Sequence, residues 1–121
     1  MNISKSEEFF EDITYQIIDN QPRLSYGISV SDTNSDGNYE FIVTGFGFNN
    51  LALTYKKGIL FNSIDQSIFL DKNRRTIGVA SCDIDQDGYE EIYFLNTDTY
   101  SGNKRYSDRL LDFDGNKFFD L

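Results

Sequence analysis

Two acidic segments of this chain, 51 residues apart, carry the side chains most capable of chemistry. They read Asp32-Thr-Asn-Ser-Asp-Gly-Asn-Tyr-Glu40 and Asp83-Ile-Asp-Gln-Asp-Gly-Tyr-Glu-Glu91. Each segment has oxygen-bearing side chains at positions 1, 3, 5 and 9 and a glycine at position 6. Calcium prefers about six to eight oxygen ligands, and a short acidic turn can wrap around it. The spacing therefore predicts a repeated calcium-binding loop.

The glycine of each segment, Gly37 or Gly88, has a specific part in such a loop. Glycine accepts a positive φ without steric cost, so the chain can bend sharply at this point. The bend lets the backbone carbonyl of position 7, Asn38 or Tyr89, face the same centre as the side chains.

The EF-hand is the first known calcium loop to compare, because it also begins with this pattern of acids and glycine. An EF-hand needs a bidentate glutamate at position 12, where this chain has Val43 and Phe94. A helix should follow an EF loop, whereas the runs after Glu40 and Glu91 are rich in the β-branched and aromatic residues of strands. The acidic segments are therefore predicted to join pairs of strands.

A metal-free hairpin turn is the simpler alternative, since Asn, Asp and Gly are favoured in turns. The repetition of the same spacing, glycine and trailing acid favours metal. A third segment, Asp112-Phe-Asp-Gly-Asn116, has its glycine at position 4 instead, and we interpret it as a hairpin turn.

Composition narrows the classes of function. The chain has 121 residues, the length of one domain, and a formal charge of 11 minus 20, or −9, which two calcium ions would bring to −5. Such a charge argues against a nucleic-acid partner and against an anionic membrane surface. No apolar run is long enough for a membrane span, and Met1 to Asn20 lacks the features of a signal peptide. The single cysteine, Cys82, is predicted to be a small buried apolar residue rather than a reactive thiol.

An internal duplication positions the two acidic loops. The 51-residue offset aligns Gly27 with Gly78 as well as the loop residues, and each copy divides into four short strands. We predict an all-β chain made of two four-stranded antiparallel blades of a β-propeller plus one N-terminal outer strand, with the calcium loops between first and second strands. The predicted strands are Ser25–Ser31, Glu40–Gly45, Asn50–Lys56 and Ile59–Ile64, then Thr76–Cys82, Glu91–Asn96, Arg109–Phe113 and Lys117–Leu121.

The predicted boundaries are an N-terminal segment at 1–24, a first blade at 25–66, a connector at 67–75 and a second blade at 76–121. The second strand of each blade is apolar throughout, which predicts burial on both faces between blades. Phe9 to Ile13 echoes the last residues of the chain and is read as the outer strand of a preceding blade, with a short amphipathic helix as the alternative. In the connector, Phe69 or Leu70 is expected to lie beneath the backbone.

The repeated pattern of glycine, spaced acids and trailing glutamate resembles the FG-GAP or VCBS repeats of integrin-like β-propellers. The second copy, Ile77 to Asn96, followed by Tyr100-Ser-Gly102 and the hairpin from Arg109 to Leu121, is similar to the cartilage acidic protein family. The resemblance implies a calcium-binding, roughly seven-bladed propeller, secreted or on the cell surface, used for adhesion and binding. By position it implies these calcium ligands: Asp32, Asn34, Asp36, Asn38 and Glu40 for one ion, and Asp83, Asp85, Asp87, Tyr89 and Glu91 for the other.

Catalysis is not expected, because the chain has no histidine, no glycine-rich phosphate loop and no nucleophile elbow. A calcium-dependent, carbohydrate-active propeller enzyme is the alternative from another class. The expected partners are other propeller blades, from copies of this chain or from the remainder of a longer one, and a protein or glycan ligand. Neither nucleic acid nor membrane insertion is expected.

Overall fold

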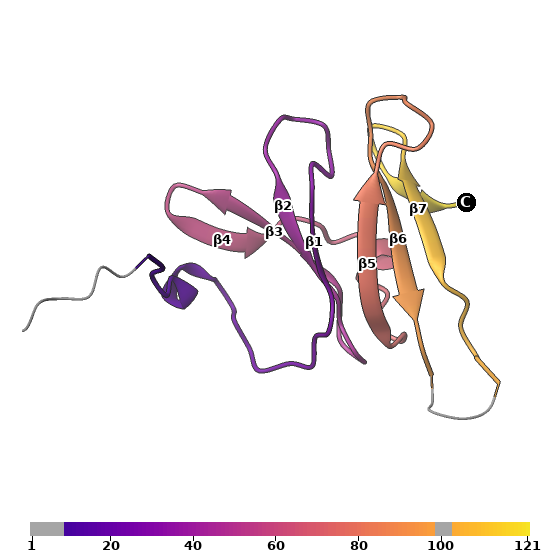
Figure 1. The fold of residues 1–121 in the computed structure, drawn as a ribbon, viewed down its shortest axis with the longest axis horizontal. Helices are drawn as coiled ribbons and strands as arrows, with labels where there is room; N and C mark the ends of the chain where they lie inside the picture. Colours follow the sequence, from indigo (N-terminus) through magenta and orange to yellow (C-terminus); the bar gives the residue numbers. More distant parts are fainter. Residues whose placement is uncertain (1–8, 99–102) are drawn as a thin grey trace, which may run out of the picture.

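The computed structural model describes residues 9–98 and 103–121, which form two four-stranded antiparallel sheets (Figure 1). In each sheet the strands lie in the order of the sequence, β1-β2-β3-β4 and β5-β6-β7-β8. The strands are β1 (Ile28–Ser31), β2 (Glu40–Val43), β3 (Leu51–Lys56), β4 (Ile59–Asn62), β5 (Thr76–Cys82), β6 (Glu91–Asn96), β7 (Arg109–Phe113) and β8 (Phe118–Asp120). The all-β prediction is confirmed, and each of the eight strands predicted for the two sheets forms.

Both acidic loops lie at the same end of the molecule (Figure 1). Strand register places each loop at the end of its own strand pair. The last pair of β1 and β2 is Ser31 with Glu40, and the last pair of β5 and β6 is Cys82 with Glu91. Each loop therefore starts and ends on a hydrogen-bonded strand pair, which holds its first and ninth positions close together.

One apolar core joins the two sheets. Ile42 of β2 and Ile92 and Phe94 of β6 are fully buried in a single cluster with Phe69. Phe69 belongs to the short helix α1 (Ser67–Leu70) in the predicted connector, and its ring meets that of Phe94 edge-on at 5.5 Å between centroids. The prediction that Phe69 or Leu70 would be covered is therefore confirmed for Phe69.

The aligned glycines of the duplication meet where β1 and β5 lie side by side (Figure 1). A Cβ atom on Gly27 would lie 2.9 Å from Gly78 Cα and 3.0 Å from the carbonyl oxygen of Ile77. Real side chains do not tolerate such contacts with backbone, so the approach of the two sheets depends on glycine here.

Two predictions were wrong in detail, and a third is met on one face only. The N-terminal segment forms no strand among the residues described: a 3-10 helix, η1 (Thr14–Gln16), is followed by a single bridge between Ile17 and Leu60. The second strands bury one face each, since Ile42 is fully buried while Phe41 beside it is 42% exposed. Cys82 is exposed, because it ends β5, the edge strand of its sheet.

None of the helices in the described part of the chain has the length and apolar character needed to cross a bilayer. The Tyr100-Ser-Gly102 segment that contributed to the family resemblance, and residues 1–8 of the predicted N-terminal segment, lie outside the described residues.

Candidate metal centre

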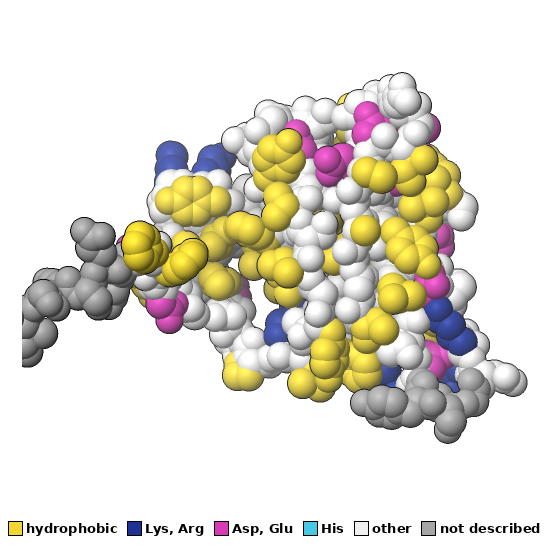
Figure 2. Space-filling view, viewed as in Figure 1, with side chains coloured by type: hydrophobic (Ala, Val, Ile, Leu, Met, Phe, Trp, Pro, Cys, Tyr) yellow, Lys and Arg dark blue, Asp and Glu magenta, His cyan; other side chains and the backbone are white. Residues whose placement is uncertain are grey.

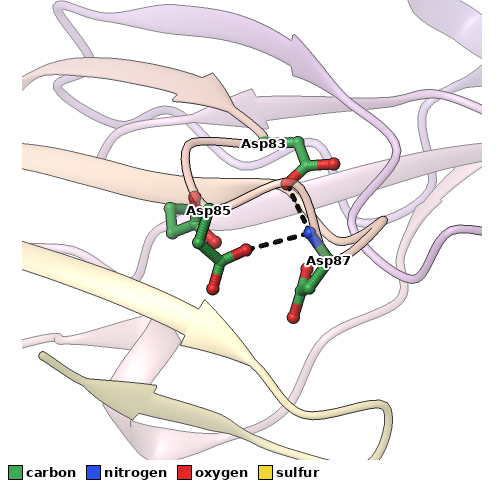
Figure 3. A group of neighbouring side chains, drawn as sticks. Asp83, Asp85 and Asp87 are labelled. Carbon is green, nitrogen blue, oxygen red and sulfur yellow. Dashed lines mark hydrogen bonds between the residues drawn. The ribbon is translucent and has the colours of Figure 1, made fainter.

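The loop between β5 and β6 is shaped by its own carboxylates. The backbone N–H of Asp87 donates to Asp83 Oδ1 at 3.1 Å and to Asp85 Oδ1 at 3.0 Å (Figure 3). The next N–H, of Gly88, donates to Asp83 Oδ2 at 3.0 Å, and Gly88 has the positive φ of 97° predicted for position 6. Gln86 also has a positive φ, 65°. The turn thus directs the first three acids inward.

Four carboxylates converge as a result. One oxygen each from Asp83, Asp85, Asp87 and Glu91 lie within 4.8 Å of one another. The group carries four negative charges, and the three aspartates are exposed while Glu91 is buried. Like charges at this separation repel, whereas calcium takes several carboxylate oxygens at once. These residues fit a hard divalent cation.

Glu91 gives independent support for a cation. It is only 3% exposed, and its Oε2 accepts a hydrogen bond from the Ile84 backbone N–H at 2.5 Å. Its other oxygen, Oε1, is buried and has no hydrogen-bond partner within the part of the chain that the structure describes. A buried polar atom without a partner costs about 1–3 kcal/mol. A bound cation would supply the missing partner.

The side chain of Tyr89, at position 7 of this loop, packs toward the last hairpin. Its ring lies edge-on to Phe113 at 5.3 Å between centroids, and its hydroxyl lies beside Gly115. Tyr89 therefore joins the loop to the turn between β7 and β8.

The loop between β1 and β2 has the same backbone pattern. The N–H of Asp36 donates to Asp32 Oδ1 and Asn34 Oδ1, both at 3.0 Å, and that of Gly37 donates to Asp32 Oδ2 at 2.8 Å. The pKa of Asp36 is lowered, chiefly by the hydrogen bond from the Asn38 backbone, so this acid is ionised at neutral pH. Figure 2 shows acidic side chains along the edge where both loops lie.

Glu40, at position 9 of the first loop, differs from Glu91 in its surroundings. Its Oε2 accepts from the Thr33 N–H at 3.0 Å and from the Thr33 hydroxyl at 2.6 Å. Its Oε1 lies 3.3 Å from the Thr54 hydroxyl, which can donate to it. Both oxygens of Glu40 thus have protein donors. The sequence did not lead us to Thr33 and Thr54. The alignment of the two loops does place Thr33 at the same position as Ile84, so it shows a hydroxyl in the first loop that the second loop lacks.

The Asp112-to-Asn116 segment covers the end of β7 and the start of the turn to β8, which agrees with the predicted hairpin. Asp114 Oδ1 accepts hydrogen bonds from the N–H groups of Asn116 and Lys117, each at 2.9 Å. These bonds lower the pKa of Asp114, the Lys117 bond most. Gly115 has a φ of 89°, which the turn requires.

Comparison with models of known protein families finds no match. Curated proteins named cartilage acidic protein 1 do match: the Xenopus tropicalis protein is 39% identical, the Homo sapiens protein 35% and the Mus musculus protein 34%. Each alignment covers 97% of this chain and 20% of the relative. Over almost its whole length the chain is therefore similar to about a fifth of the cartilage acidic protein 1 sequence.

Proposed function

We propose that this chain is a non-catalytic calcium-binding module, with one ion in each acidic loop. The observation that carries the proposal is Glu91, which is buried beside three aspartates and has one carboxylate oxygen without a hydrogen-bond partner among residues 9–98 and 103–121. Calcium fits better than magnesium, because magnesium demands near-ideal octahedral geometry and usually retains several waters. Four protein carboxylates on a short turn offer the crowded, oxygen-only shell that calcium accepts.

Calorimetric titration tests the proposal. Asp87→Ala should remove the calcium site of the second loop, and Asp36→Ala that of the first, so each variant should bind one ion fewer. Asp65→Asn is the matched control, because Asp65 is an exposed acid between β4 and α1 and its replacement changes the net charge alone. Unchanged stoichiometry in both loop variants would refute calcium binding at these loops.

We further propose that the two sheets are neighbouring blades of a β-propeller. Each sheet has four antiparallel strands in sequence order, as a blade has, and the loops repeat at one edge. The outer face of the first sheet presents Ile28, Val30 and Phe41 to solvent at 66%, 52% and 42% exposure. Exposed apolar faces of this kind usually mark interaction sites. More blades, from copies of the chain or from a longer chain, would cover them.

Sedimentation at high concentration tests the blade assignment. Association of copies is the expected result, since a new sheet packed on the first would bury the exposed apolar side chains. A compact monomer at all concentrations would mean that these faces need no cover and would argue against a propeller segment.

We propose an extracellular binding or adhesion role. The name of the relatives refers to cartilage, a tissue rich in extracellular matrix. Extracellular calcium modules bind the ion weakly, with dissociation constants of about 10⁻⁴ to 10⁻³ M. A dissociation constant below about 10⁻⁶ M would therefore argue against this role.

A further inference from the structure

The two position-9 glutamates face different residues across their sheets. β2 and β3 pair Phe41 with Leu53, so the next position places Thr54 opposite Glu40. β6 and β7 pair Ile92 with Leu111, so the next position places Asp112 opposite Glu91. Residues directly opposite each other in antiparallel strands share a face, with Cβ atoms about 4.5–5.5 Å apart. One structural position thus holds threonine in the first sheet and aspartate in the second.

In the first sheet this position satisfies the glutamate. The Thr54 hydroxyl donates toward Glu40 Oε1 at 3.3 Å and toward Ser63 Oγ at 2.8 Å, so the two acceptors share its single hydrogen. With the two donors of Thr33, the Glu40 carboxylate is stabilised by the protein alone.

In the second sheet the same position cannot satisfy the glutamate. An ionised carboxylate has no hydrogen to donate, so Asp112 offers nothing to Glu91 Oε1, the oxygen equivalent to the one that Thr54 serves. Isoleucine at position 84 likewise has no hydroxyl to match that of Thr33. Asp112 is half-buried, and its Oδ1 accepts from the Phe113 N–H at 2.6 Å. Like charges directly opposite in a sheet destabilise it unless a cation compensates them.

We propose that Asp112 is a positioning residue of the second calcium site, an inference that rests on the proposed calcium function. Asp112 raises the calcium affinity of the second site above that of the first. Asp112 is not one of the four carboxylates within 4.8 Å of one another, so it does not act as a ligand. It acts through its negative charge, and because it donates no hydrogen bond to Glu91 Oε1, that oxygen stays available for the ion. Thr54 has the opposite effect on the first site, because it satisfies Glu40 without metal.

Reciprocal substitutions test this assignment. In an Asp36→Ala background, which leaves only the second site, Asp112→Thr should weaken calcium binding about tenfold, as measured by calorimetry. Ten-fold corresponds to about 1.4 kcal/mol of binding free energy. In an Asp87→Ala background, which leaves only the first site, Thr54→Asp should strengthen binding by a similar factor. Asp65→Asn, in either background, should leave the affinity within twofold.

Two results would overturn the inference while leaving the proposed function intact: calcium affinity unchanged by Asp112→Thr, or unchanged by Thr54→Asp. If Asp112→Thr does not fold, Asp112→Asn removes the charge at constant shape, and an unchanged affinity of that variant has the same meaning. Loss of the proposed function is distinct, because the unmodified chain would then bind no calcium at all. The amide resonances of Gly37 and Gly88 assign each binding event to its loop.

Discussion

Replacing each position-9 glutamate by glutamine should have opposite effects on stability in the absence of calcium. Glu91 is buried beside three aspartates within 4.8 Å, and one of its oxygens has no hydrogen-bond partner in the described part of the chain. At this separation each pair of like charges costs about 1 kcal/mol in a water-like dielectric. Glu91→Gln removes those pairs and keeps an oxygen for the Ile84 N–H. The three pairs together amount to about 3 kcal/mol, and burying the amide group of glutamine offsets about 1–2 kcal/mol of this, so we expect Glu91→Gln to stabilise the calcium-free protein by about 1–2 kcal/mol.

Glu40→Gln should instead destabilise the calcium-free protein. Glu40 is 2% exposed, and its two oxygens together have three donors from Thr33 and Thr54. The NH2 group of glutamine would replace one of these two oxygens and would face a hydrogen-bond donor of Thr33 or Thr54, to which it cannot serve as acceptor. Leaving a buried polar group in such a position costs about 1–3 kcal/mol.

Thermal unfolding followed by circular dichroism measures both effects. For a chain of this size 1 kcal/mol shifts the melting temperature by about 3–5 °C. With calcium at about 100 times its dissociation constant, each occupied site should add about 2.7 kcal/mol, and Glu91→Gln should lose this gain. The variant would then be more stable than the original protein in chelator and less stable in calcium. Destabilisation by Glu91→Gln of equal size in both conditions would refute the reasoning.

Three further predictions concern the framework. Burial raises the pKa of Asp108, but hydrogen bonds from Lys104, the Asn96 backbone and Tyr93 together lower it below its ordinary value. Asp108→Asn should therefore cost about 1 kcal/mol near pH 6 in denaturant titrations, and the difference should vanish as the pH falls through the lowered pKa. Phe69→Ala should cost about 3–5 kcal/mol in the same assay, and a cost below 1 kcal/mol would mean that the sheets do not share one core. Gly27→Ala should cost about 1–3 kcal/mol, while the control Gly78→Ala, whose Cβ would meet only Leu95 at 3.5 Å, should be tolerated; equal costs would contradict the close approach.

The strands were predictable because local pattern decides them. Alternation of apolar residues, together with Asp-Gly turns, defined all eight to within about three residues at each end. The N-terminal segment was not predictable in this way. There the Asp12 carboxylate accepts a hydrogen bond from the Thr14 N–H at 2.9 Å, a local contact that favours the 3-10 turn over an extended strand.

The acidic loops were visible in the sequence, but the difference between them was not. Spacing alone brings Asp83, Asp85, Asp87 and Glu91 together, and the structure places them as a cluster. The hydrogen bonding of Glu40 depends on Thr54, 14 residues away on β3, and the absence of such a donor to Glu91 depends on the register of β7. Cross-strand register is a tertiary property, which no pattern within a nine-residue loop reveals.

The tightness of the carboxylate cluster sets how the protein should respond to ordinary salt. The Debye length is about 8 Å at physiological ionic strength, whereas the clustered oxygens lie within 4.8 Å of one another. Mobile monovalent ions therefore screen these charges poorly, and Glu91, being buried, is screened least. Sodium or potassium chloride should not replace the divalent ion. Calcium binding to this loop should therefore change little with the concentration of monovalent salt around physiological ionic strength.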